Sequence, residues 1–197
     1  MTQRVEKENL RRRIRTVRAA MSSAQRAAAS AAVGTRLTEL LQSLSSHRPL
    51  ETVAVYLAKA EEANIDVVAE WLMARGVHVV APRSVTADEP PFYSLRSLRE
   101  GLTIAAFGVR VPQEFVGGRV YGPEDVDLVL APGLAFDREG GRLGFGIAWY
   151  DRMLPRAPLS IGICFDCQLV ERVPREEHDR GVAMIVTETQ TIDVAHK

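Results

Sequence analysis

The residues that could do chemistry gather in one short stretch, "RLGFGIAWYDRML", residues 142–154. Gly144 and Gly146 can leave backbone N–H groups open to a ligand, and the helix expected to start near residue 146 or 147 would add more. Arg142 supplies a planar cation that suits phosphate oxygens, and Asp151 supplies a carboxylate for a magnesium ion. The composition is that of a phosphate-binding loop.

A second interpretation of the same stretch is structural. The glycines would then only permit a tight turn, Trp149 and Tyr150 would fill the core, and Asp151 would offset the helix dipole. Glycine spacing alone is weak support for a phosphate site. Both interpretations stay open on residue types alone.

The N-terminal segment offers a second group of cations. An amphipathic helix is predicted by apolar residues at helical spacing, namely Leu10, Ile14, Val17 and Met21. Beside them runs a basic stripe of Lys7, Arg11, Arg15 and Arg18. Such a stripe is a solvated face, the rim of an anion site or a nucleic-acid surface. The formal net charge of +0 provides no overall field for nucleic acid, so we expect no such partner.

The elements that must position these residues follow from apolar patterning. Ser22 or Ser23 caps a second helix, and later short apolar runs alternate with a helical pattern that ends at Gly76. The expected strands cover residues 52–58, 77–82, 91–95, 127–136, 159–165 and 183–187. Because these runs are apolar on both faces, we predict a doubly wound, mostly parallel sheet in a three-layer α/β/α sandwich. Ligands of such sheets bind beyond the carboxyl ends of strands, where the glycine-rich stretch lies.

The chain is expected to form one domain over residues 1–197. The helices of residues 1–48 would pack on the α/β core, and residues 189–197 would form a loose tail. Cys164 and Cys167 lie in "GICFDCQLV", which continues the strand pattern past residue 165 and puts their side chains on opposite faces, so we predict two reduced structural thiols. No secretory signal or run of about twenty apolar residues is seen, so we expect a cytoplasmic protein without a membrane partner.

Four segments, taken in order, resemble the 5-formyltetrahydrofolate cyclo-ligase family, also called 5,10-methenyltetrahydrofolate synthetase. They are "KENLRRRIRTVRAAM", "YLAKAEEANI", "PGLAFDREGGRLGFGIAWYDRML" and "GICFDCQLVERVPREEHDRGVAMIVTE". The resemblance runs from about residue 5 to residue 188, and residues 132–151 are its most specific part. It implies that ATP and magnesium serve to convert 5-formyltetrahydrofolate into 5,10-methenyltetrahydrofolate, with ADP and phosphate as the other products.

The resemblance also implies roles for individual residues. Arg142 and Tyr150 would be catalytic, Glu62 would bind the folate, and Asp151 would bind magnesium. The ATP site would consist of Lys7, Arg11, Arg142, Leu143, Gly144, Phe145, Gly146, Ile147, Ala148, Trp149 and Tyr150. The folate site would consist of Glu62, Leu57, Phe145, Trp149 and Tyr150. A monomer or weak homodimer is expected.

The sequence departs from the family pattern at several positions. Ala148 replaces a usual glycine, Trp149 a usual tyrosine, and Ile147 a glycine or lysine. Val111 replaces a common glutamate, and Ala183 a second magnesium-binding aspartate. A catalytically weakened or repurposed relative that binds nucleotide or folate is therefore the alternative. His178 and Asp179 match a family pair, for which a role in a turn or helix end is expected.

Overall fold

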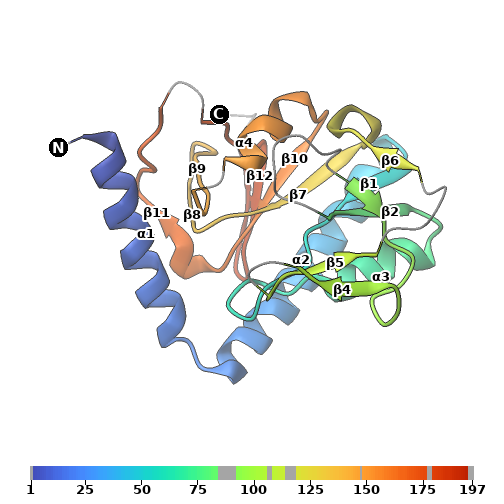
Figure 1. Ribbon diagram of the computed structural model, residues 1–197, viewed down its shortest axis with the longest axis horizontal. Helices are drawn as coiled ribbons and strands as arrows, with labels where there is room; N and C mark the ends of the chain where they lie inside the picture. Colours follow the sequence, from blue (N-terminus) through green and yellow to red (C-terminus); the bar gives the residue numbers. More distant parts are fainter. Residues whose placement is uncertain are drawn as a thin grey trace.

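A computed structural model of the chain describes residues 2–83, 92–105, 108–113, 119–146, 148–176 and 179–194. Its centre is an eight-stranded sheet with the order β13-β12-β10-β7-β1-β2-β3-β6 (Figure 1). The strands are β1 (Thr52–Ala54), β2 (His78–Pro82), β3 (Phe92–Ser94), β6 (Val120–Tyr121), β7 (Leu128–Pro132), β10 (Ser160–Ile163), β12 (Met184–Val186) and β13 (Thr191–Asp193). The five strands from β12 to β2 pair in parallel, and β13, β3 and β6 add antiparallel edges. The predicted mostly parallel α/β fold is confirmed.

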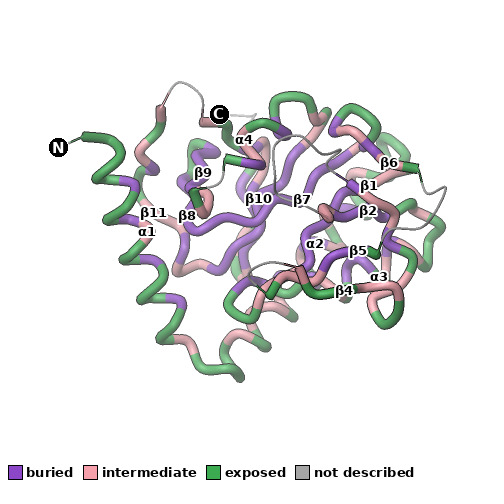
Figure 2. Tube along the Cα trace, viewed as in Figure 1, coloured by how far each residue is buried: buried purple, intermediate pink, exposed green. Residues whose placement is uncertain are grey.

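Helices and short turns cover the two faces of this sheet. On one face lie α2 (Ser23–His47) and α3 (Asp66–Ala74), whose Val33, Leu37 and Leu72 are buried with Val53 of β1. On the other face lie α4 (Trp149–Met153) and the short 3-10 helix η3 (Leu154–Arg156). Between them, the central strands β7 and β10 are buried along their whole length (Figure 2). Apolar residues on both faces of the strands thus find a covering layer on each side.

The helix α1 (Gln3–Ala20) packs away from this main sheet, on a small three-stranded sheet of β11 (Leu169–Val170), β8 (Ala135–Asp137) and β9 (Arg142–Leu143) (Figure 1). Leu10 and Ile14 meet Ala135, Leu143 and Val173 in a separate apolar cluster. The sequence analysis expected one strand over residues 127–136, but the chain leaves the main sheet after Pro132 and enters the small one. This change of sheet brings α1 beside the glycine-rich stretch.

The remaining elements are short. A two-stranded hairpin joins β4 (Leu102–Ile104) to β5 (Arg110–Pro112), and the 3-10 helices η2 (Pro123–Asp125) and η4 (Asp166–Gln168) connect strands. Ser22 caps α2 in a capping box with Gln25, as its position before the helix predicted. Within the part of the chain that the structure describes, no helix is long and apolar enough to cross a membrane.

Three local expectations were wrong. Residues 191–193 form β13, which pairs with β12 and buries Ile192, so this part of the expected loose tail belongs to the sheet; residues 195–197 lie outside the described residues. Cys167 lies in η4 rather than in a strand with Cys164, although both cysteines are free as expected. Val17 is exposed and Arg18 takes its place on the buried face of α1, because Lys7, Leu10, Ile14 and Arg18 share the helical spacing.

Candidate active site

The expected site residues lie beyond the carboxyl ends of β1 and β7, which are neighbours in the sheet. In the sheet, β2 lies on the far side of β1, and β10 lies on the far side of β7. The direction in which successive strands are added to the sheet therefore reverses between β1 and β7. The loop after β1 carries Lys59 and Glu62, and the chain after β7 leads to residues 142–151. A reversal of strand order opens a crevice in doubly wound sheets and is their usual ligand site.

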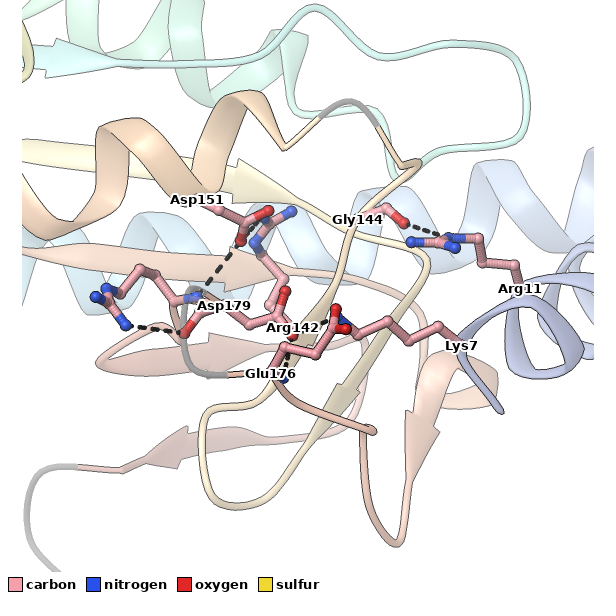
Figure 3. A network of polar contacts seen from close by, with 8 residues as sticks. Lys7, Arg11, Arg142, Gly144, Asp151, Glu176 and Asp179 are labelled. Carbon is pink, nitrogen blue, oxygen red and sulfur yellow. Dashed lines mark hydrogen bonds and ion pairs between the residues drawn. The ribbon is translucent and has the colours of Figure 1, made fainter. Parts of the chain in front are cut away.

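The first helix and the glycine-rich stretch are in direct contact. The guanidinium Nε of Arg11 donates a hydrogen bond of 3.1 Å to the carbonyl oxygen of Gly144 (Figure 3). Gly146 has a positive φ of 103°, and a Cβ placed there would lie 3.8 Å from the guanidinium carbon of Arg11. A backbone in this conformation favours glycine and brings Arg11 close to the exposed main chain. The two segments expected to share an anion are therefore side by side.

Arg142 lies at the buried base of this stretch, in β9. Its Nη2 donates to Oδ1 of Asp151 at 2.7 Å, and its guanidinium carbon lies 5.3 Å from the ring centroid of Tyr150. Its Nε is buried with no hydrogen-bond partner. Burial, and next the charge of Glu62, raise the pKa of Tyr150, so its hydroxyl stays protonated and can donate a hydrogen bond.

Lys7 comes from the first turns of α1 and is only 7% exposed. Its Nζ lies 2.5 Å from Oε2 of Glu176 and 2.5 Å from Oδ2 of Asp179 (Figure 3). Burial acts to lower the pKa of Lys7, but hydrogen bonds and charges from Asp179 and Glu176 outweigh it and raise the pKa. Lys7 is thus a cation held by two carboxylates, next to the pair of Arg142 and Asp151.

Glu62 follows β1 and is buried, with Oε2 accepting a hydrogen bond of 2.8 Å from the backbone N–H of Lys59. Burial raises the pKa of Glu62, opposed by that hydrogen bond and by the charges of Lys59 and Arg18. Phe145 lies near two cations, with Nζ of Lys59 at 5.1 Å and the guanidinium carbon of Arg18 at 6.0 Å from its ring centroid. Lys59 and Glu62 line one cavity, and Lys59 and Phe145 line a second, so Lys59 lies between the two.

Three of the expected site residues have their side chains in the core. Leu57 packs in the cluster under α2 and α3, and Leu143 packs against α1. Trp149 is 4% exposed and meets the rings of Phe92 and Tyr150 edge-on, at centroid distances of 5.6 Å and 4.7 Å. Trp149 thus packs as the structural interpretation of the sequence expects, while its assignment to the ligand sites stays a prediction.

The helix after the glycines begins later than expected, at Trp149 rather than at residue 146 or 147. Ala148 precedes it with φ 55° and ψ 19°, and is the only residue other than glycine with positive φ among the described residues. The left-handed conformation costs a residue with a Cβ about 1–2 kcal/mol. Glycine, which lacks a Cβ, would adopt this conformation without that cost, whereas the backbone of Ala148 is strained. Ile147 lies outside the described residues.

Asp151, the one residue expected to hold magnesium, is not part of a cluster of acidic side chains among the described residues. Asp151 already pairs with Arg142 through Oδ1, which also lies 3.5 Å from the backbone nitrogen of Arg180. In the described part of the chain, no three His, Cys, Asp or Glu side chains are grouped to hold a metal ion. Ala183 offers no ligand and instead donates its N–H to Ser160. The donor set does not fit a magnesium ion held by the protein alone.

The sequence analysis missed two participants, Glu176 and Lys59, and named Arg18 only as part of the basic stripe, without its burial. Glu176 is 169 residues from Lys7 in the chain, so no local pattern could have joined them. Asp179 has the expected turn role, because its Oδ2 accepts from the backbone N–H of Glu176, but it also pairs with Lys7. His178 lies outside the described residues.

Comparisons with known proteins identify the family of the chain. Residues 3–188 match the model of the 5-formyltetrahydrofolate cyclo-ligase family. The 5-formyltetrahydrofolate cyclo-ligase of Mycolicibacterium smegmatis is 31% identical over 69% of this chain and 73% of its own, and that of Haemophilus influenzae is 26% identical over 88% and 93%.

Solved structures extend the comparison to the fold. The 5,10-methenyltetrahydrofolate synthetase of Aquifex aeolicus superposes with a TM-score of 0.78 at 30% identity, covering 97% of this chain and 94% of its own. A synthetase of the same name from Mycoplasma pneumoniae, at 22% identity and a TM-score of 0.69, shares the fold. The chain belongs to the 5-formyltetrahydrofolate cyclo-ligase family.

Proposed function

We propose that this protein catalyses the ATP-dependent cyclisation of 5-formyltetrahydrofolate to 5,10-methenyltetrahydrofolate, giving ADP and phosphate. The observation that carries the proposal is the contact between α1 and the glycine-rich stretch, through Arg11 and Gly144, beyond the strands where the order reverses. It gathers Lys7, Arg11 and Arg142 around backbone that can approach a triphosphate. Family membership supports cyclo-ligase activity on 5-formyltetrahydrofolate, and the cations around this backbone support the use of ATP.

The chemistry asks the protein for position and charge rather than for a nucleophile. The formyl oxygen attacks the γ-phosphorus and ADP leaves; N10 then attacks the activated formyl carbon, phosphate departs with the formyl oxygen, and the N10 proton is lost. Lys7, Arg11 and Arg142 would neutralise the charge that develops on the phosphoryl oxygens. Tyr150, which is half-buried and stays protonated, would donate a hydrogen bond to the reacting groups.

Glu62 is proposed to bind the N–H edge of the pterin. Its second oxygen, Oε2, is already engaged by the backbone of Lys59, which fixes the carboxylate in one orientation. An ionised carboxylate accepts hydrogen bonds only and so matches a ring edge that offers N–H donors. Magnesium would come with the nucleotide, with Asp151 as its one expected protein ligand, since magnesium ordinarily keeps several waters and phosphate oxygens.

The test is a spectrophotometric assay of methenyl product formation with ATP, magnesium and 5-formyltetrahydrofolate. We expect turnover by the parent protein, a large loss in Arg11→Gln, and no loss in Arg13→Gln, because Arg13 is an exposed arginine of the same helix. Absence of turnover over a range of pH and metal concentration would refute the proposal.

The second candidate is a relative that binds its ligands without efficient turnover. It is favoured by the strained Ala148 and by Ala183, which leaves the proposed magnesium with a single protein carboxylate. A large gain of rate in Ala183→Asp would support this candidate. The parent rate in that variant would count against a role for the position.

A further inference from the structure

Arg18 is the least satisfied charged group that the structure describes near the site. It is 5% exposed, and its Nε and Nη1 are buried without a hydrogen-bond partner. Its Nη2 lies 4.0 Å from Oε2 of Glu61, whose side chain is 55% exposed. Burial lowers the pKa of Arg18, opposed by Glu62 and Glu61. A guanidinium buried with open donors destabilises a fold unless a ligand uses them.

Arg18 borders a cavity of 540 Å³ between the second half of α1, the loop after β1 and Phe145. Arg15 and Lys59 line the same cavity, and Glu61 is its one acidic side chain. The walls therefore carry a net positive charge beside an aromatic ring. This combination suits a ligand with a flat ring next to an oxyanion.

We propose that Arg18, with Arg15 and Lys59, forms the subsite for the glutamate carboxylates of the folate substrate, whose benzoyl ring would lie beside Phe145. The proposal rests on the proposed function for the identity of the ligand. Beyond that function, it names the chemical group that this cavity binds, a carboxylate, and the residue that binds it, Arg18.

The nucleotide is the other possible source of an oxyanion, and the helix geometry argues against it. Lys7 and Arg11 reach the phosphate region from the first half of α1, whereas Arg18 lies eleven residues beyond Lys7 and seven beyond Arg11. At 1.5 Å per residue these separations are roughly 16 Å and 10 Å along the helix. Glu62, which would take the pterin, directly follows Glu61 of the cavity wall. The cavity thus adjoins the folate end of the site.

The experiment compares binding of 5-formyltetrahydrofolate with binding of its pteroate analogue, which lacks the glutamate, by calorimetry on the full chain. In the parent we expect loss of the glutamate to weaken binding by about 10-fold to 100-fold, as for a lost charge-assisted hydrogen bond. In Arg18→Gln the ratio of the two dissociation constants, pteroate analogue over 5-formyltetrahydrofolate, should fall to near one. The affinities for the pteroate analogue and for an ATP analogue should stay at the parent values. Arg13→Gln, the exposed control, should keep the parent ratio.

Arg18→Lys keeps the charge without the planar donors and should keep part of the ratio, and thermal melting shows that each variant is folded. A structural role would weaken the full folate and its analogue alike, and this outcome would overturn the proposal. So would an unchanged ratio in Arg18→Gln, the absence of a glutamate preference in the parent, or a selective loss of ATP-analogue binding, which would assign the cavity to phosphate.

Failure of the proposed function is recognised separately. If the parent neither binds nor converts 5-formyltetrahydrofolate, ligand-observed NMR with p-aminobenzoylglutamate and p-aminobenzoate decides the subsite. Glutamate-dependent binding that is lost in Arg18→Gln would support it. Equal signals from p-aminobenzoylglutamate and p-aminobenzoate would overturn it, as would equal signals with the parent and with Arg18→Gln.

Discussion

Lys7 pairs with two carboxylates in the structure, yet the proposed function requires its charge for ATP. Glu176 can be separated from this arrangement, because its side chain is 39% exposed whereas that of Asp179 is 15% exposed. We predict that Glu176→Gln tightens ATP binding. Lys7 is buried but Glu176 is partly solvated, so we take the upper end of the range for exposed ion pairs, about 1 kcal/mol, and expect a gain of about fivefold in Kd.

The complementary change, Lys7→Met, removes the cation itself. It should weaken ATP binding by about 10-fold or more, the loss of one charge-assisted phosphate contact. It also leaves Glu176 and Asp179 facing each other, which should lower the free energy of unfolding by about 2 kcal/mol. A fully buried pair would lose roughly 3–5 kcal/mol, but Glu176 is partly solvated.

Calorimetric titration of an ATP analogue into the parent, both single variants and the double variant completes the cycle. If Glu176 acts by restraining Lys7, its substitution has no effect once Lys7 is methionine. A gain that persists in the double variant would show simple repulsion between Glu176 and phosphate. Parent-like affinity in Lys7→Met would refute the placement of Lys7 in the nucleotide site.

Further predictions concern single buried groups. Burial raises the pKa of the Glu62 carboxyl, so the folded protein binds the carboxyl proton more tightly than the unfolded chain does. The free energy of unfolding should therefore fall as pH rises from below 4.5 through the raised pKa. Glu62→Gln should abolish this pH dependence in urea titrations and should weaken folate binding. Arg142→Met leaves Asp151 without its buried partner, so urea unfolding should show a loss of about 2–4 kcal/mol in addition to weaker ATP binding. Arg18→Met should raise the thermal midpoint while folate binding weakens, since it removes buried donors without partners. Ala148→Gly should change unfolding stability by less than about 1 kcal/mol, because relief of strain is offset by unfolded-state entropy, whereas Ala148→Val should destabilise by about 1–2 kcal/mol.

The fold could be predicted from the sequence because its determinants are local. Strands such as β7 and β10 are apolar on both faces, which requires a layer on each side of the sheet. Ser22 preceded α2 as a cap, and Gly76 ended the pattern of α3 with a positive φ of 78°. The loose tail was mispredicted because β13 is only three residues long and is held by pairing with β12, which sequence patterning does not show.

The site could be predicted in part. The proximity of α1 to the glycine-rich stretch was expected from cations and glycines near one strand end, and Arg11 does contact Gly144. Burial of Lys7 and Arg18 could not be predicted, because a helical stripe of cations ordinarily faces water. The left-handed Ala148 was also hidden, since alanine in sequence indicates helix rather than strain.

The central claim is that α1 and the glycine-rich stretch together bind the triphosphate. Hydrogen–deuterium exchange of the full chain, with and without a non-hydrolysable ATP analogue and magnesium, tests it directly. The account predicts slower exchange on nucleotide binding in two separate segments, residues 3–15 and residues 142–152. Protection confined to other segments, with these two unchanged at saturating nucleotide, would contradict it.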